Sequence, residues 1–426
     1  MNDLYPLPGE VCRYAKYEHF LNHRYQTGQW VFWEDQLTNI LRGEYNNVFP
    51  LHVEYTITYQ CNFNCPWCSC RAARRNFARK KHPHSELDNI ANPYIGWNGI
   101  SKILHHLAEK NVGIQWTGGE PLIHPNFINA VKKANALGIK QCIFSNGSLL
   151  NNSTIHSLLE SAPEFIRISL NAIAPETHAK FHGLPSLKYS KKVLENIESL
   201  VAIKLANNSK TLIGLSFVID YDNLNETDNI VNYLKYLCNK YGPKPIDYCI
   251  LRPAYAFNSS IVHLSNADKK ALNKILSPSS LNKKVGERSE IDFIVPDFSF
   301  QTQMDHFATM KNLECISYGL FGEITPIGEM IICSDKYGDN EFSIGNISKD
   351  ALSTIWKSDI RSSIINKVNS THCLQKQCPR NGRGFLFNQI FHDIEYHRGI
   401  GQINLVSKWI DDLRNTIPIP THSFYL

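Results

Sequence analysis

The sequence lacks three features that would assign it to a special class of protein. No window approaches the roughly 20 consecutive apolar residues that a membrane-spanning helix needs. The opening segment MNDLYPLPGE has neither the basic nor the apolar region of a secretory signal. No large charge excess is present either, because 44 basic residues face 39 acidic ones, which argues against a nucleic-acid partner. These absences predict a cytoplasmic protein with no membrane or nucleic-acid partner.

The size and the cysteine content narrow the class further. A chain of 426 residues with 43% hydrophobic residues can bury a sizeable core without the help of disulfides. Its twelve cysteines are therefore better explained by metal binding where they cluster, since the cytoplasm is reducing. One local excess of positive charge, at residues 71–84, is either a solvated surface segment or an anion-binding flank of a site.

The middle of the chain alternates between β-rich runs and helical patterns. We expect six strands, at 52–58, 112–117, 139–145, 165–170, 212–219 and 246–251. Apolar residues spaced by three and four predict helices between them, at 99–110, 124–138, 191–205 and 228–242. Strands alternating with helices indicate parallel βαβ units. The predicted fold class is therefore α/β, with a partial (β/α)6 TIM-like barrel.

The alternation of strands and helices stops on both sides of this barrel, which we place at residues 51–253. Residues 1–50, with Trp30, Phe32 and Trp33, are expected to form a helical N-terminal cap. The remainder divides into a linker region over 254–310 with one helix near 267–277, a further domain over 311–385 with a hairpin at 322–333 and a helix near 351–367, and a helical tail over 386–426.

Three cysteines stand close together directly after the first expected strand. The stretch YQCNFNCPWC, residues 59–68, contains Cys61, Cys65 and Cys68, on a loop where barrels of this kind build their sites. Structural zinc usually takes four protein ligands, and no histidine lies nearby at ligand spacing. Three thiolates can instead hold three irons of a 4Fe-4S cluster and leave the fourth iron open. An open iron implies substrate or cofactor chemistry.

This arrangement resembles the radical SAM superfamily, whose hallmark is CxxxCxΦC with an aromatic Φ, here Trp67. The resemblance implies a 4Fe-4S cluster whose open iron binds S-adenosyl-L-methionine. It also implies reductive cleavage of that cofactor to a 5'-deoxyadenosyl radical, which abstracts a hydrogen atom from the substrate. An electron donor of the flavodoxin or ferredoxin type would be the partner. Zinc binding or a chance pattern is the alternative.

Further residues match positions at which this family holds its cofactor. The motif WTGGEP resembles the family's GGE motif, which contacts the methionine amino group, and FSNG and RISLNA follow at the ends of later strands. The resemblance suggests Ser169 and Asn171 for the ribose, Arg167 for a carboxylate, and Val218 and Leu251 for the adenine. A turn or an ion pair is an equally good role for some of them. The full predicted cofactor-binding set is Trp67, Gly118, Gly119, Glu120, Ser145, Asn146, Arg167, Ser169, Asn171, Val218 and Leu251.

A second group of cysteines lies in the C-terminal third. Cys315, Gly328 and Cys333 form C-x12-G-x4-C, which resembles the opening of the SPASM and twitch domains that carry auxiliary iron-sulfur clusters in this family. Cys373 and Cys378 bring the thiols to four, enough for one closed cluster. A full SPASM domain carries seven cysteines and two clusters, so one auxiliary 4Fe-4S cluster is expected, with structural zinc as the alternative. Buried structural roles are expected for Cys12, Cys70, Cys142, Cys238 and Cys249.

The resemblance specifies the chemistry better than the substrate. Relatives with such modules mostly modify peptides, so the expected reaction is oxidation, crosslinking or epimerisation of a peptide or amino-acid residue. The alternative is dehydrogenation or epimerisation of an aminoglycoside or another sugar-derived small molecule. A more distant alternative is a metal-binding scaffold without catalytic activity. Which residue serves as hydrogen-atom donor or base stays open.

Overall fold

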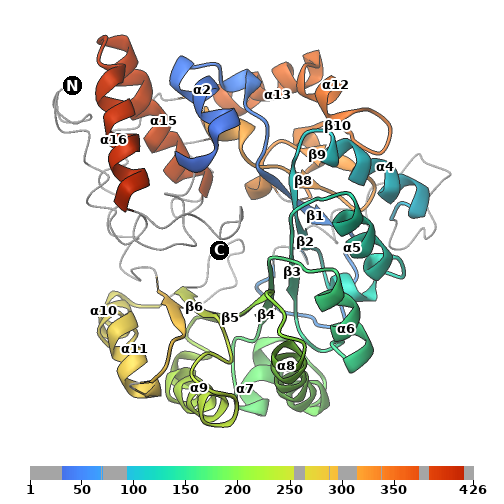
Figure 1. The fold of residues 1–426 in the computed structure, drawn as a ribbon, viewed down its shortest axis with the longest axis vertical. Helices are drawn as coiled ribbons and strands as arrows, with labels where there is room; N and C mark the ends of the chain where they lie inside the picture. Colours follow the sequence, from blue (N-terminus) through green and yellow to red (C-terminus); the bar gives the residue numbers. More distant parts are fainter. Residues whose placement is uncertain are drawn as a thin grey trace.

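One curved, open sheet organises the molecule (Figure 1). The computed structural model describes residues 31–68, 70, 94–253, 264–286, 288–295, 314–336, 338–373 and 383–416. The predictions for Cys12, Trp30, the basic run at 71–84 and Cys378 lie outside these residues. The sheet has ten strands in the order β10-β9-β8-β1-β2-β3-β4-β5-β6-β7.

The first six strands confirm the predicted parallel core. They are β1 (His52–Thr56), β2 (Gly113–Thr117), β3 (Gln141–Ser145), β4 (Phe165–Ser169), β5 (Leu212–Ile219) and β6 (Tyr248–Pro253). Each pairs in parallel with the next. Strands that are covered on both faces have nearly continuous apolar sequences, as in the run LIGLSFVI of β5. The carboxyl ends of all six strands meet at one edge, which is where a site can form.

The linker prediction for 254–310 is wrong in part. This region contains α10 (Asn266–Ile275), but also α11 (Pro278–Val285) and β7 (Asp292–Ile294), which extends the parallel sheet beside β6. A three-residue strand is too short to give a periodic pattern, and the Ser- and Lys-rich sequence around it concealed the strand. The sequence therefore did not predict β7 as a parallel strand beside β6.

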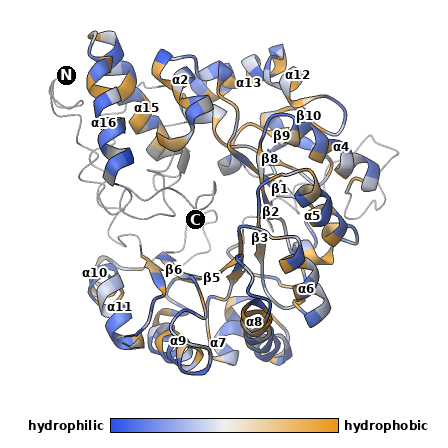
Figure 2. Cartoon of the chain, in the orientation of Figure 1, coloured by the Kyte–Doolittle hydropathy of each residue, from blue (hydrophilic) through white to orange (hydrophobic). Residues whose placement is uncertain are grey.

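Helices cover the outer side of the sheet (Figure 1). They are α4 (Trp97–Ala108), α5 (Phe127–Ala136), α6 (Asn152–Glu160), α7 (Pro175–Phe181), α8 (Lys188–Ala206) and α9 (Thr227–Tyr241). Figure 2 shows hydrophilic residues along their outer sides. The apolar residues of α5 that recur at three and four, Phe127, Ala130, Val131 and Ala134, are buried. No helix in the described part of the chain is long and apolar enough to cross a membrane.

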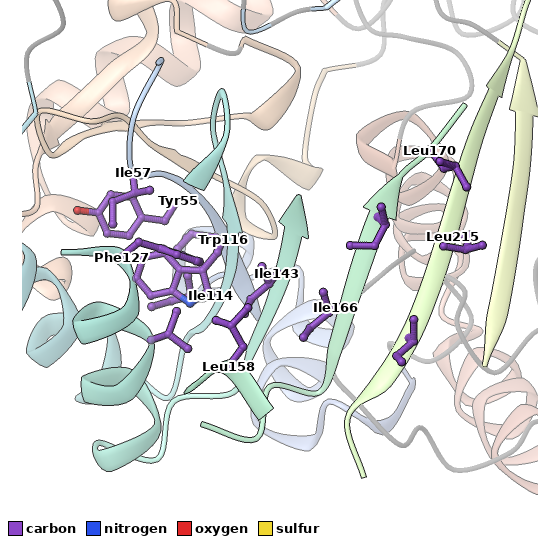
Figure 3. Packing of buried hydrophobic residues seen from close by; sticks show 14 of the residues in the cluster. Tyr55, Ile57, Ile114, Trp116, Phe127, Ile143, Leu158, Ile166, Leu170 and Leu215 are labelled. Carbon is purple, nitrogen blue, oxygen red and sulfur yellow. The ribbon is translucent and has the colours of Figure 1, made fainter. Parts of the chain in front are cut away.

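The main core lies between the sheet and these helices (Figure 3). Trp116 of β2 is fully buried there, stacked on Tyr55 of β1 at 5.2 Å and in edge contact with Phe127 at 5.6 Å. Its indole Nε1 donates to Oε1 of Gln141 on β3 at 2.7 Å. Because the buried indole has a partner, the bulky side chain fixes β2 between β1 and β3 immediately before the GGE motif.

The C-terminal third continues the same sheet. β8 (Glu323–Ile324) pairs in parallel with β1, and β9 (Glu329–Ile331) and β10 (Ser343–Asn346) add to it in antiparallel fashion. The β8–β9 pair confirms the predicted hairpin. The helix expected near 351–367 is two helices, α12 (Leu352–Trp356) and α13 (Asp359–Ser370), separated at Ser358, whose side chain caps α13. The two halves of the chain thus share one sheet.

The ends of the described chain pack on each other. α2 (Glu34–Arg42) and η3 (Tyr45–Asn47) form a second core with α15 (Arg383–Gly399) and α16 (Ile403–Thr416). Trp33 stacks on Phe387 at 6.0 Å. The described part of the predicted N-terminal cap therefore lies against the helical tail, and Trp356 Nε1 ties it to α12 by donating to the carbonyl of Val48 at 2.9 Å.

Candidate functional site

The three clustered cysteines lie on the loop that leaves the carboxyl end of β1. Cys61, Cys65 and Cys68 are half-buried and form no disulfide. The backbone N–H of Phe63 points at Cys61 Sγ, at 3.3 Å, while the Phe63 ring is buried in the main core and anchors the loop. Burial raises the pKa of Cys61 to about 11. The loop thus presents its thiols at the sheet edge from a fixed backbone.

The backbone of the GGE motif is hydrogen-bonded to the segment that carries the cysteines. Gly119 N donates to Thr58 O and Glu120 N to Gln60 O, both at 2.8 Å. A Cβ on Gly119 would lie 2.0 Å from the carbonyl oxygen of Gln60, and one on Gly118 would lie 2.4 Å from that of Thr58. Both glycines are therefore required for β2 to approach the loop that carries the cysteines.

Glu120 is buried and binds the end of β3. Its carboxylate accepts hydrogen bonds from Ser145 Oγ at 3.0 Å, Asn146 N at 2.7 Å and Leu122 N at 3.2 Å. Burial raises its pKa to about 7, although these hydrogen bonds oppose the rise. The structure brings the predicted residues Glu120, Ser145 and Asn146 together. The carboxylate oxygens, however, face the β3 loop as acceptors.

Asn146 continues this network to the cysteines. Its Nδ2 donates to Asn62 Oδ1 at 2.9 Å and lies 3.9 Å from Cys61 Sγ. Asn62 in turn donates to Ser148 Oγ at 2.8 Å. A buried network in which each group has a partner stiffens its surroundings. The end of β3 thus helps to hold the first cysteine in place.

A histidine that sequence reasoning missed lies against the second cysteine. His182, just after α7, is buried and its Nδ1 is 3.1 Å from Cys65 Sγ. Its carbonyl accepts from Asn64 N at 3.0 Å, and that of Phe181 accepts from Trp67 Nε1 at 3.2 Å. The segment around His182 therefore supports the cysteine loop at Asn64, Cys65 and Trp67, in addition to the support from the GGE motif. In the sequence His182 lies 117 residues from Cys65, with no local pattern connecting them.

The remaining predicted contacts follow at the ends of β4, β5 and β6. The guanidinium of Arg167 lies over the Phe144 ring at 3.7 Å, and Ser169 is half-buried beside Ser216 of β5. Asn171 adopts a left-handed backbone with φ 60°, and its Oδ1 accepts from Val218 N at 2.8 Å. The side chain of Asn171 therefore joins β4 to β5.

Val218 and Leu251 do not share a face of the sheet. Val218 is in register with Arg252, while Leu251 is in register with Phe217, and both Leu251 and Phe217 are fully buried in the main core under the helices. Successive side chains of a strand point to opposite faces. Leu251 thus packs toward the helices, and Val218 stands on the inner side of the sheet.

The second cysteine group lies around the β8–β9 hairpin. Cys315 precedes η7 (Ser317–Gly319), Cys333 follows β9, and Cys373 lies just beyond α13. Burial raises the pKa of Cys315. Gly328 forms the hairpin turn with φ 80°. Cys315 and Cys333 thus stand on either side of the hairpin and Cys373 follows α13, while the fourth predicted ligand, Cys378, lies outside the described residues.

The two cysteine groups are joined by the pairing of β8 with β1. Glu323 of β8 is buried, and its carboxylate accepts from Thr56 Oγ1 of β1 at 3.0 Å and from Gly338 N at 2.7 Å. Over the described ranges, no three His, Cys, Asp or Glu side chains converge on one metal-ion position. A 4Fe-4S cluster distributes its thiolates over separate irons, so its ligands need no common point.

Comparisons with known proteins were made against families, sequences and solved structures. The model of the radical SAM superfamily matches residues 55–234, and that of the SPASM iron-sulfur cluster-binding domain matches 315–379. The alignment with a PqqA peptide cyclase of Gluconobacter oxydans has 21% identity and covers 77% of this chain and 82% of that protein. A probable GTP 3',8-cyclase of Sulfurisphaera tokodaii is 22% identical over 42% of this chain, which spans half the length of that protein.

Solved structures share the fold. Streptococcus suis SuiB bound to its precursor peptide SuiA has a TM-score of 0.57 and 16% identity, with 83% of this chain and 77% of that chain covered. The parallel sheet and its two cysteine groups define an iron-sulfur enzyme of the α/β class. The chain carries a radical SAM domain over residues 55–234 and a SPASM-type iron-sulfur cluster-binding domain over residues 315–379. Its cofactors are S-adenosylmethionine and iron-sulfur clusters, and the three thiols on one loop suit the open cluster.

Proposed function

We propose that this enzyme modifies a peptide, with Cys61, Cys65 and Cys68 holding the cluster that binds S-adenosylmethionine. The observation that carries the proposal is the support of the cysteine loop by two separate segments. The GGE backbone and the Glu120–Asn146 network hydrogen-bond to this loop, and the segment around His182 contacts it at Asn64, Cys65 and Trp67. Such rigid support is what a site needs if its reacting groups must be positioned to within fractions of an ångström.

When bound, the cluster and S-adenosylmethionine would supply the radical chemistry that removes a hydrogen atom from the substrate. The protein's own residues would orient and shield it. The inner side of the sheet offers Ser169 and Val218 beside the cofactor, with Arg167 held over Phe144 as a fixed positive charge for a carboxylate. Trp67, packed on Phe181 at a ring distance of 5.1 Å, would cover the cluster on the side of α7. An electron donor of the flavodoxin or ferredoxin type would dock near this edge.

We infer a second, closed 4Fe-4S cluster on Cys315, Cys333, Cys373 and Cys378. Four thiolates leave no iron open, so this cluster would transfer electrons and bind no substrate. The continuous pairing from β1 to β8 supports a role in the same reaction, since it fixes the two cysteine groups to one rigid sheet. Such a cluster would supply an acceptor for the second electron of a two-electron oxidation, in which the first electron leaves the peptide with the hydrogen atom and a proton leaves to a base or to water.

The choice of a peptide rests on how far the comparisons extend along the chain. The PqqA peptide cyclase aligns with 77% of this chain, which is more than the barrel alone. SuiB, whose structure was solved with a bound precursor peptide, matches 83% of this chain. The probable GTP 3',8-cyclases align with 35–55% of this chain. Proteins that share both halves with this chain are thus named for peptides, which favours a peptide over a nucleotide or a sugar.

Anaerobic reconstitution tests the chemistry first. About eight irons per chain, and 5'-deoxyadenosine formed from S-adenosylmethionine and dithionite, are expected. Replacing Cys61, Cys65 and Cys68 by Ala should abolish cleavage and leave about four irons. The matched control is Cys238→Ala, because this half-buried thiol lies on α9, outside both cysteine groups, and donates to the Pro243 carbonyl. Iron binding without cleavage would refute the enzyme assignment.

The substrate is tested separately, with short peptides encoded beside the gene. Co-expression followed by mass spectrometry should show loss of two hydrogen atoms for an oxidation or crosslink. An unchanged mass with one solvent deuterium gained in heavy water would indicate epimerisation. Cleavage of S-adenosylmethionine with no change in any such peptide, but turnover of an aminoglycoside, would refute the peptide assignment alone.

A further inference from the structure

Helix α15 lies outside the SPASM match at 315–379 but packs on the first ligand loop of that domain. Phe387 and Phe391 are fully buried in the second core, where their rings lie 5.7 Å apart. Large buried aromatic side chains fix a helix in position. The side chain between them in sequence, Asn388, is therefore set in place by the core around it.

Asn388 is fully buried and uses both ends of its amide on the segment that follows Cys315. Its Oδ1 accepts from Ile316 N at 2.7 Å and from Ser317 N at 3.2 Å. Its Nδ2 donates to Ser317 Oγ at 2.8 Å and to Cys315 Sγ at 3.4 Å. The two backbone donors fix the oxygen end of the amide, so the nitrogen end must face the sulfur.

A second residue of α15 holds the same segment from the other side of Cys315. His392, one turn further along, has its Nε2 2.7 Å from the carbonyl oxygen of Glu314. Positions four apart share a helix face. One face of α15 thus hydrogen-bonds to the backbone at Glu314, just before Cys315, and at Ile316 and Ser317, just after it. Asn388 is the residue of this helix face that donates a side-chain N–H to the sulfur of Cys315.

We propose that Asn388 is a positioning residue that sets the reduction potential of the auxiliary cluster. This inference rests on the cluster proposed above for Cys315, Cys333, Cys373 and Cys378. Hydrogen bonds to cluster sulfurs favour the reduced, more negative state and raise the potential. The Asn388 amide offers such a bond from a buried position, where water does not weaken it. The C-terminal helix is then part of the electron-transfer site.

The test uses the full chain in which Cys61, Cys65 and Cys68 are Ala, so that only the auxiliary cluster gives a signal. Asn388→Asp keeps an acceptor for the two backbone N–H groups and removes the donor to sulfur. Asn388→Leu removes the donor without adding charge. The matched control is Asn369→Ala, because Asn369 Oδ1 accepts from the backbone N of Cys315 at 2.9 Å and does not contact the sulfur by hydrogen bond.

Redox titration monitored by EPR should show a lower midpoint potential in both Asn388 variants. The ratio of reduced to oxidised cluster at the wild-type midpoint is expected to fall on the order of tenfold, which equals about 59 mV for one electron. Asn369→Ala should leave it nearly unchanged. Metal and sulfide analysis is done first on each variant.

Four results would overturn the inference. With iron retained, an unchanged potential in both Asn388 variants, or an equal shift in Asn369→Ala, refutes it and leaves the auxiliary cluster intact. Loss of iron from both Asn388 variants alone would assign Asn388 a purely structural role. Zinc in place of iron would refute the auxiliary cluster and this inference together.

Discussion

Replacing Gly119 by Ala should remove most of the activity without unfolding the protein. The added Cβ would lie 2.0 Å from Gln60 O, whereas real Cβ contacts essentially never fall below 3.0 Å. The loop must therefore move by at least about 1 Å, and the hydrogen bond from Glu120 N to Gln60 O at 2.8 Å is lost. Because Gln60 directly precedes Cys61, this movement reaches the first ligand.

A displacement of this size is expected to lower the rate of S-adenosylmethionine cleavage by about 100-fold or more. The assay is 5'-deoxyadenosine formed per reconstituted cluster, with iron content and the thermal midpoint measured on the same sample. The control is Gly399→Ala at the end of α15, where an added Cβ meets nothing within 4 Å. If the Gly119→Ala protein holds a full cluster and cleaves S-adenosylmethionine at the wild-type rate, the close approach of the GGE backbone is not required.

Three further predictions concern buried groups. Burial raises the pKa of Glu323 from its ordinary 4.5 to about 8; the folded state thus binds this proton more tightly than the unfolded chain. Wild type should therefore lose stability relative to Glu323→Gln as the pH rises from 5 to 8, by up to about 4 kcal/mol in denaturant titrations, and a constant difference would contradict this. His182→Leu should lower iron retention at the cysteine loop, measured after desalting, while His156→Leu on the exposed side of α6 should not. Gly214→Ala should destabilise by about 1–3 kcal/mol, because its Cβ would lie 2.1 Å from Tyr248 Cζ; Tyr248→Leu in the same chain should recover most of that loss in a double-mutant cycle.

Much of the barrel could be predicted from the sequence because its strands are covered on both faces. A run such as LIGLSFVI is continuous and apolar only where both faces are buried. β7 was missed because three residues carry no periodicity, and its place beside β6 depends on packing with α11. The break between α12 and α13 was missed because the apolar spacing continues across Ser358.

The candidate site was predictable where its residues are adjacent in sequence. The cysteine loop and the GGE motif are each one short segment, so their patterns survive in the sequence. Contacts made by the fold leave no such pattern, and His182 and Asn388 reach their cysteines from distant helices. For Glu120, the sequence predicted the position at the end of the second strand. It could not predict that the carboxylate accepts hydrogen bonds from Ser145 and Asn146.

The pairing of β8 with β1 has a consequence for how this chain is made. Thr56 and Glu323 are hydrogen-bonded partners separated by 267 residues. At about 5–20 residues per second, a ribosome needs roughly ten to fifty seconds between synthesising these two residues. Through that interval, the edge of β1 that later pairs with β8 offers unpaired backbone N–H and C=O groups in the nascent polypeptide, and such groups attract other strands. Co-translational folding of the first 253 residues would therefore end in an intermediate that is prone to aggregate, and chaperone binding at that stage should raise the yield.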